Sequence, residues 1–367
     1  MFKNSIYDNA LNCENYNLTY DFLNGVLGID VVECYPTKYG FHILDDNEKS
    51  YMLCEINSNE IHKYNYLFDI LNLFEKKCGN VLGMHTHDSK NIFYDKLNNE
   101  NYVVFKCGNY IKYSDFDFCK IENSLKNFYS LSESCLNDFK NFNLIEDIEL
   151  LRVGQDFKLI GPRLERIKIL NKIVEFSDDN DMKKFLNHHC KILFNYLLNV
   201  REFFLSPLYK KYCENHKNIR FINGWLSNRT FAIENDKINL CNFYNSSINL
   251  FVKDLSSLID KLIPYFGNEI LFKFILNIIE NFEGDKREHL KVLKNYIKFN
   301  NSLEKFFGES FLKFNCEKFQ YFSESKLIEL NNLNKKLNDL LNLISSFWFL
   351  EDLFFWKSQN SLIALFV

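Results

Sequence analysis

The spacing of apolar residues changes from a strand-like to a helical pattern near residue 115, and this change limits the fold more than any other feature of the chain. Before it, short segments rich in β-branched and aromatic residues alternate with turn residues, as in antiparallel hairpins. After it, apolar residues recur mostly at spacings of three and four, which is typical of amphipathic helices. The strand-like segments are 39–44, 50–56, 80–87 and 101–107, with a helical segment at 59–77 between them.

One stretch interrupts the helical pattern, RFINGWLSNRTFAIENDKINLCNFYN at 220–245. Its segments FAI and INLCNF have strand character and are joined by the turn residues END. A connector at 107–115 links the first sheet to the helices. We therefore expect an α+β, bilobal chain with an antiparallel-sheet small lobe at 1–108, a mainly helical large lobe at 109–346 that contains the hairpin, and an apolar tail at 347–367.

The net charge and the hydropathy of the chain indicate whether nucleic acid or a membrane is an expected partner. The net charge of −4 gives no electrostatic reason to expect nucleic acid. The apolar stretch FWFLEDLFFW is interrupted by Glu351 and Asp352, so we expect no membrane partner, and the amino-terminal stretch lacks the apolar core of a secretory signal. We therefore expect synthesis in the cytoplasm. The 11 cysteines form no CxxC pair, which favours reduced, buried thiols.

Taken in order, four parts of the chain resemble a known family. They are SYMLCEI with the helix at 59–77, NYVVFKCGNYI with SLKNFYSLSE, INGWLSNRTFAIENDKINLCNF, and VKDLSSLIDKL. On these segments the chain resembles the CotS-type spore coat proteins of endospore-forming bacteria, whose fold is that of aminoglycoside phosphotransferases and choline kinases. The resemblance implies a bilobal protein-kinase-like fold.

The resemblance also indicates where catalytic groups would stand. Phosphoryl transfer in a kinase fold uses a lysine that holds the nucleotide phosphates and an aspartate that orients the attacking hydroxyl. The lysine position, read from a Tyr-x-Leu-Lys pattern in YMLC, is Cys54. Where the family motif reads His-Gly-Asp, this chain has Asn223, Gly224 and Trp225. Both groups are therefore replaced by uncharged side chains.

The metal-binding positions implied by the resemblance are changed as well. The metal-ligand asparagine is replaced by Thr230, and Asn228 is nearby but out of register. The Ile-Asp-Phe motif reads Cys-Asn-Phe, which places Asn242 at the last metal ligand. Phe243 and Asp254 match the family pattern, as does the glycine before Trp225. The resemblance thus predicts an intact frame around a site without its catalytic groups.

These substitutions predict a catalytically inactive phosphotransferase. Mg²⁺ prefers carboxylate oxygens, and Trp225, Thr230 and Asn242 offer no negative charge. We expect Trp225 to fill the remaining cleft. The resemblance implies a pseudokinase that serves as a structural or interaction component of the spore coat, with other spore coat proteins as partners, with no cofactor or metal, and with a path from the mother-cell cytoplasm to the coat. The alternative is a small-molecule phosphotransferase with atypical active-site residues.

A second alternative starts from NVLGMHTHDSKNIFYDKLN. His85 and His87 are similar to the His-x-His zinc motif of JAMM-type metallopeptidases, in which two histidines and an aspartate bind Zn²⁺. The serine and aspartate positions of that family read Asp95 and Asn98 here, so only Asp95 or Asp88 can complete the ligand set. In the kinase-like register, THDSKN is instead a hairpin turn.

The carboxyl-terminal region carries a non-catalytic signal. Leucine, isoleucine and phenylalanine residues from 330 to 347 fall at spacings of three and four, which indicates a heptad-like seam. This helix either packs on the large lobe or provides a surface for a partner or for a homo-oligomer. His188 and His189 are adjacent on a helix and face different directions, so we do not expect them to chelate one ion.

Overall fold

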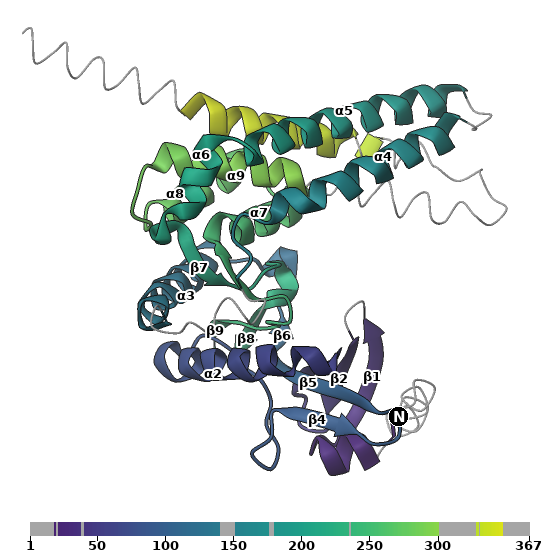
Figure 1. Cartoon of the computed structure of the whole chain (residues 1–367), viewed down its shortest axis with the longest axis vertical. Coiled ribbons are helices and arrows are strands. Elements are labelled where there is room, and N and C mark those ends of the chain that lie inside the picture. Colours follow the sequence, from purple (N-terminus) through teal and green to yellow (C-terminus); the bar gives the residue numbers. More distant parts are fainter. Residues whose placement is uncertain are drawn as a thin grey trace, which may run out of the picture. The chain divides into compact units, whose positions relative to one another are not determined.

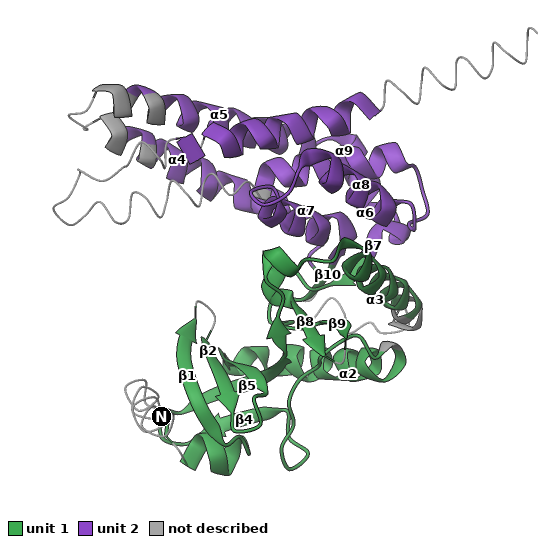
Figure 2. Ribbon diagram, turned by 180° about the vertical axis from the view of Figure 1, so that it is seen from behind, with its two compact units in different colours: residues 1–151, 220–248 green, residues 152–219, 249–367 purple. Residues whose placement is uncertain are grey.

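A computed structural model describes residues 18–19, 21–37, 40–139, 151–175, 180–234, 236–300, 328–329 and 331–347. Two compact units are present, coloured separately in Figure 2. Unit 1 comprises residues 1–151 and 220–248, and unit 2 comprises residues 152–219 and 249–367. Unit 1 thus groups the hairpin at 220–245 and residues 109–151 with the sheet, and the expected division into lobes after residue 108 stays a prediction.

Unit 1 contains a five-stranded antiparallel sheet with the order β1-β2-β3-β5-β4 (Figure 1). Its strands are β1 Val31–Thr37, β2 Gly40–Asp45, β3 Ser50–Ile56, β4 Ile92–Asp95 and β5 Glu100–Cys107. The sequence predicted β2, β3 and β5 but not the two edge strands. Pro36 lies within β1, where an edge strand tolerates the missing N–H. β4 has only four residues, which is too few for a clear alternation of apolar and polar side chains.

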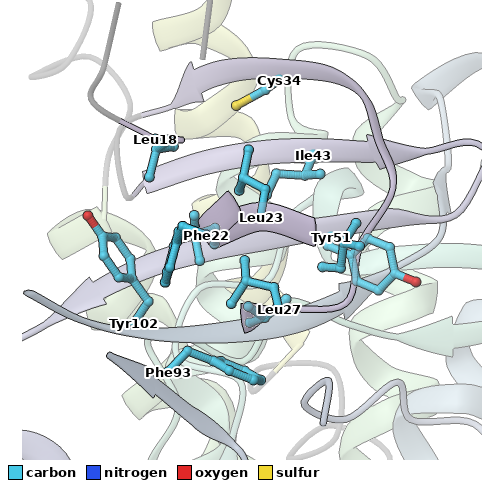
Figure 3. Packing of buried hydrophobic residues seen from close by; sticks show 12 residues of the cluster. Leu18, Phe22, Leu23, Leu27, Cys34, Ile43, Tyr51, Phe93 and Tyr102 are labelled. Carbon is cyan, nitrogen blue, oxygen red and sulfur yellow. The ribbon is translucent and has the colours of Figure 1, made fainter. Parts of the chain in front are cut away.

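One face of the sheet is covered by the segment before β1. Residues Asp21–Val26 form a short π-helix whose Phe22 and Leu23 are buried. They pack with Leu27, Tyr102 and Phe93 in one apolar cluster (Figure 3). This burial of aliphatic and aromatic area holds the amino-terminal segment on the strands.

Helix α2, Ile61–Cys78, was predicted from its apolar face and is confirmed. Tyr64, Leu67, Leu71 and Phe74 of that face are buried. The helix ends at Gly79, which is left-handed at φ +62° and donates its N–H to the carbonyl of Glu75. Glycine adopts this conformation without the steric cost that a Cβ adds.

The segment 80–87 is not the regular strand that its sequence predicts. Within it, Val81 forms a parallel bridge with Leu240 and Met84 an antiparallel bridge with Phe105. The Leu82 N–H donates to the Leu240 carbonyl at 2.7 Å, and the Leu240 N–H donates to the Asn80 carbonyl at 2.8 Å. The segment therefore passes from one sheet to another, which shortens its pairing with each.

The predicted hairpin is confirmed as β8 Phe231–Glu234 and β9 Lys237–Leu240. It forms a three-stranded sheet with β6, Asn109–Tyr110, in the order β6-β8-β9. Helix α3, Phe118–Phe139, contributes Ser124, whose hydroxyl donates to the Ile238 carbonyl and accepts from the Asn80 amide. These contacts, all inside unit 1, place the hairpin against α3 and the segment that follows α2.

The described part of unit 2 is mainly helical, as predicted. Its helices are α4 Ile160–Glu175, α5 Asn180–Phe204, α6 Pro207–Glu214, α7 Phe251–Leu262, α8 Asn268–Ile279 and α9 Lys286–Asn300. Strands β7 Ile219–Ile222 and β10 Ser247–Leu250 form a two-stranded sheet, and each strand contains a boundary between the units. None of the described helices is long and apolar enough to cross a membrane.

The apolar seam near the carboxyl end is used inside unit 2. Residues 331–347 are helical, and Leu337, Leu340 and Ile344 are buried. The Asn268 amide donates to the Lys336 carbonyl at 3.0 Å, which ties this helix to the start of α8. These seam residues thus pack inside unit 2, as in the first of the two alternatives, and the homo-oligomer stays a prediction. Leu330 and the tail at 348–367 lie outside the described residues.

A buried polar network links several helices of unit 2. Asp156, which is 2% exposed, accepts from Lys253 Nζ at 2.7 Å and from the Tyr296 hydroxyl at 2.6 Å. The Tyr296 hydroxyl also lies 2.8 Å from that of Tyr209. Every member of the network has a partner, which buried polar groups require.

We expect Asp156→Ala to lower the free energy of unfolding by about 3–5 kcal/mol, because it leaves Lys253 and Tyr296 without their acceptor in a buried site. Glu165→Ala is the matched control, since Glu165 forms a mostly exposed pair with Lys168 and its loss costs less than about 1 kcal/mol. Urea denaturation of both variants measures the difference. Equal losses would contradict the assigned role of the network.

Candidate functional site

The position expected to carry the catalytic lysine lies inside the protein core. Cys54 stands on β3 opposite Val103 of β5, and its side chain is 0% exposed. Burial raises the pKa of its thiol well above the usual value. A lysine that holds phosphates must place its ammonium group in a cleft, and this position instead faces packed side chains.

Two tyrosines occupy the surroundings of Cys54. Tyr64 comes from α2 and Tyr244 from the segment after β9, and their rings stack with centroids 6.2 Å apart at 21°. Burial first, and then the neighbouring Tyr244, raises the pKa of Tyr64, and burial also raises the pKa of Tyr244. Both hydroxyls are therefore neutral at physiological pH. A stacked, uncharged pair stands beside the lysine position.

The ion pair that active kinases need has no counterpart at Cys54. In protein kinases the strand lysine pairs with a glutamate of the small-lobe helix. Here Glu75 of α2 pairs with Lys106 of β5 at 2.8 Å. Both side chains of this pair are about one-third exposed, so it is a partly solvated pair at another place on the sheet.

The loop after β7 keeps the backbone frame that the resemblance predicts. The Asn223 amide donates to the carbonyls of Cys241 and Asn242 at 3.1 and 3.3 Å, which joins this loop to the end of the hairpin. Gly224 has φ +89°, and a Cβ added there would lie 2.0 Å from the Asn245 carbonyl oxygen. Only glycine fits this close approach.

The Thr230 side chain forms its hydrogen bonds within a local turn. Its hydroxyl accepts from the Ser227 N–H at 3.0 Å and donates to the Ser227 carbonyl at 2.7 Å. The amide of Asn228, the out-of-register asparagine, donates to the Ile111 carbonyl at 3.1 Å. Both side chains therefore fasten the segment before β8 and are not arranged as metal ligands.

Asn242 has an unusual backbone conformation and an uncharged side chain. It has φ +58°, in the left-handed region where asparagine and aspartate are enriched among non-glycine residues. Asparagine therefore fits the turn that an aspartate would fit. Among the residues that the structure describes, no group of three or more histidine, cysteine, aspartate or glutamate side chains is arranged to hold a metal ion.

Trp225, which was expected to fill the cleft, lies partly at the surface. Its side chain is 38% exposed. The interior is filled instead by phenylalanines from several elements of unit 1. Phe221 stacks on Phe243 with centroids 6.3 Å apart, and Phe74 and Phe128 meet Phe221 edge-on. These rings support the loop because they bury a large apolar area directly beneath it.

Helix α3 anchors the strand that leads into this loop. The Ser132 hydroxyl accepts from the Phe221 N–H at 2.5 Å. Arg220, only 2% exposed, pairs with Glu133 at 2.8 Å. The sequence analysis did not assign a role to either α3 residue, because neither belongs to a local motif. Asp254, at the predicted supporting position, is fully buried in the first turn of α7 in unit 2.

A cysteine cluster near the hairpin was also missed. Cys107 ends β5 and Cys241 follows β9, and both thiols are buried. The Cys107 thiol donates to the Phe105 carbonyl and the Cys241 thiol donates to the Arg229 carbonyl, each at 3.7 Å. Tyr35 and His42 lie close to Tyr110, and they stack on each other with centroids 4.7 Å apart. A usable signal was present, because the strand segments YMLC, VFKC and INLC each end in cysteine.

The residues of the zinc alternative do not come together as a ligand set. His85 Nε2 lies 2.8 Å from the Leu27 carbonyl, and burial lowers the pKa of this histidine. His87 lies 3.8 Å from Asp88 and is partly exposed. Asp95 accepts from the Leu97 N–H and the Asn98 amide in its own turn. His87 and Lys90 form an antiparallel backbone bridge on either side of residues 88 and 89, which confirms the predicted turn.

Comparison with solved structures identifies the fold. An aminoglycoside phosphotransferase from Alicyclobacillus acidocaldarius matches with a TM-score of 0.61 and 10% identity over 88% of this chain and 95% of that one. The fold is that of the aminoglycoside phosphotransferases. Spectinomycin phosphotransferase bound to AMP matches with a TM-score of 0.56 at 13% identity, over 88% of this chain and 96% of that one.

An amicoumacin kinase in complex with AMP-PNP, Ca²⁺ and Ami gives a TM-score of 0.53 at 13% identity, over 92% of this chain and 96% of that one. No family model matches the sequence, and no curated protein matches it significantly. At these identities the likeness establishes the α+β, bilobal kinase-like fold and not an activity.

We expect Gly224→Ala to destabilise unit 1 by roughly 2–5 kcal/mol, because the new Cβ meets a backbone oxygen and the left-handed conformation adds strain. Gly25→Ala is the control, since nothing lies within 4 Å of a Cβ at that position. Thermal unfolding of the two variants distinguishes them. A Gly224→Ala protein as stable as the control would show that the loop does not have the described backbone.

Proposed function

We propose that this chain is a non-catalytic, kinase-like protein. The observation that carries the proposal is the placement of Cys54, fully buried beside the Tyr64 and Tyr244 stack. A lysine introduced there would bury an ammonium group without a carboxylate partner, which is costly. The site is therefore built around neutral groups and not around an ion pair.

The chemistry of the metal positions supports the same proposal. A bound nucleotide needs a divalent ion, which takes oxygen ligands and above all carboxylates. The side chains at the three altered positions are an exposed indole at Trp225, the turn-forming hydroxyl of Thr230 and the neutral amide of Asn242. None of them neutralises a cation. Loss of the orienting aspartate alone costs orders of magnitude in rate.

The narrower part of the proposal concerns where the protein acts. On the basis of the sequence resemblance to CotS-type proteins, we propose that it is a structural or interaction component of the spore coat, made in the mother cell and bound to other coat proteins. Its binding would use outer surfaces, because Cys54 is buried and the Thr230 hydroxyl is bonded within its own turn.

This narrower proposal predicts that the protein is retained in the coat fraction of mature spores of its source organism. Immunodetection in extracted coats, in decoated spores and in the mother-cell lysate measures the distribution, with a cytoplasmic enzyme as the control. Recovery only in the soluble lysate would contradict a coat role and leave the non-catalytic proposal intact.

The competing function is a small-molecule phosphotransferase with atypical residues. It is favoured by the solved structures of the same fold, which are described as phosphotransferases and kinases. A cation is also available on α2, since Lys63 Nζ lies 4.9 Å from the centre of the Tyr64 ring. Lys63 is paired with Glu60 at 3.5 Å, so an enzyme would have to release it from this contact.

We expect no change in melting temperature when ATP is added with Mg²⁺ or Mn²⁺. A ligand that binds only the folded state at a hundred times its dissociation constant stabilises it by about 2.7 kcal/mol, which thermal melting detects. An active aminoglycoside phosphotransferase measured in parallel is the positive control. A metal-dependent shift in this protein that disappears in Lys63→Ala would establish the competing function.

A gain-of-function variant tests the same two alternatives by measuring phosphoryl transfer. Trp225→Asp restores the orienting carboxylate alone, and we expect no ATP-dependent phosphorylation from it because the lysine and metal ligands stay absent. Trp225→Phe is the matched control for loss of the indole. Measurable phosphoryl transfer by Trp225→Asp would show that the other groups have been replaced from elsewhere in the chain.

A further inference from the structure

Helix α9 of unit 2 carries most of its positive charge along one face. Its sequence, KREHLKVLKNYIKFN, contains five lysine or arginine residues and a single acidic residue, Glu288. Residues three, four and seven positions apart on a helix share a face. Four of the cations fall at these spacings and form the basic stripe: Arg287, Lys291, Lys294 and Lys298. Lys291 is exposed and the other three are half-buried.

The helix that contains the apolar seam, here called the seam helix, lies against the second half of the basic stripe. Lys294 Nζ donates a hydrogen bond to the Ser345 hydroxyl. Lys298 Nζ lies 5.7 Å from the centre of the Tyr196 ring, and the Tyr196 hydroxyl donates to the side-chain carbonyl of Asn338. Moving forward along α9 thus corresponds to moving backward along the seam helix, so the two helices run antiparallel.

The half-buried lysines of the stripe favour a negatively charged neighbour. Burial lowers the pKa of Lys294, and the nearby charge of Lys298 lowers it further. Burial also lowers the pKa of Lys298. Like charges four residues apart on a helix repel each other, and partial removal from water adds to the cost of each charge. A carboxylate beside this row therefore gains more from Coulomb attraction than it would at a fully solvated site.

The chain has two adjacent carboxylates, Glu351 and Asp352, at a matching distance. Asp352 comes seven residues after Ser345, and seven residues make about two full turns of a helix, so the two positions share a face. In the antiparallel direction, seven residues back from Lys294 along α9 is Arg287. The register of the two helices, extended past the end of the seam helix, thus brings Asp352 opposite Arg287.

We propose that the basic stripe is the docking surface for the acidic pair Glu351 and Asp352 of the chain's own apolar tail. The seam helix is described as far as Phe347, so only four residues separate its end from Asp352. The other residues at 348–356 are all apolar, which makes the two carboxylates the part of this segment that a basic surface attracts. The proposal stands on the register of the two helices and does not depend on the proposed function.

Zero-length carbodiimide cross-linking of the native full-length chain tests this contact, because the reagent joins a carboxylate to a lysine amine only where the two groups meet. We expect mass spectrometry to find a peptide that links a tail carboxylate to Lys291 or Lys294. The pair of Glu75 and Lys106, 2.8 Å apart, is the positive control. Formation of the control link without a link from the tail to the basic stripe would overturn the proposal.

A mixture of isotope-labelled and unlabelled protein distinguishes the chain's own tail from the tail of a second copy. Linked peptides in which both halves carry the same label support docking within one chain. Linked peptides that combine the two labels at the frequency of random mixing would assign the tail to a second copy and overturn the proposal. Neither result depends on the folding of a variant.

A charge exchange separates an ion pair from apolar packing of the tail. Arg287→Glu should raise the rate at which chymotrypsin cleaves the tail by about two- to fivefold at low salt, and Arg287→Glu combined with Asp352→Arg should restore the original rate. Lys168→Glu on α4 is the control, since Lys168 is mostly exposed and paired with Glu165, and it should leave the rate unchanged. Failure of the double exchange to slow cleavage would show that no ion pair holds the tail.

Discussion

The backbone pairing of Leu240 is the constraint on which the organisation of unit 1 depends. Its carbonyl and N–H bond to the segment at 80–82, and this pairing fixes the hairpin of 231–240 against the region that follows α2. Buried backbone groups must find partners, so the hairpin cannot leave without exposing or orphaning them. The positions of Cys54, Asn223 and Asn242 relative to one another follow from this attachment.

Around that attachment, the positions that the sequence resemblance assigns to charged catalytic groups carry neutral side chains. In an active kinase the lysine, its glutamate partner and the metal-binding aspartate stabilise one another as buried or partly buried charges. When one of them is lost, the others carry an uncompensated charge in a poorly solvated site. Cys54, the Tyr64 and Tyr244 pair and Asn242 are neutral, so under the proposed non-catalytic function the site carries no such uncompensated charge.

The groups that hold the backbone have been kept for a different reason. Gly224 has no room for a Cβ, and Asn242 takes a left-handed conformation that few residues adopt easily. The Asn223 amide bridges the two loops whether or not a reaction takes place between them. These contacts hold the fold together whether or not the site is catalytic.

The sequence by itself determined the elements with regular periodicity and the degenerate motifs. It predicted α2, the hairpin and the long helices, because their apolar spacing is local information, and it identified Cys54, Thr230 and Asn242 as uncharged. Only the tertiary structure decided which side chains surround those positions. Tyr64, Tyr110 and Tyr244 come from separate elements, and Trp225 is partly exposed where a plug was predicted. The partners of a buried residue depend on long-range packing, which no local pattern encodes.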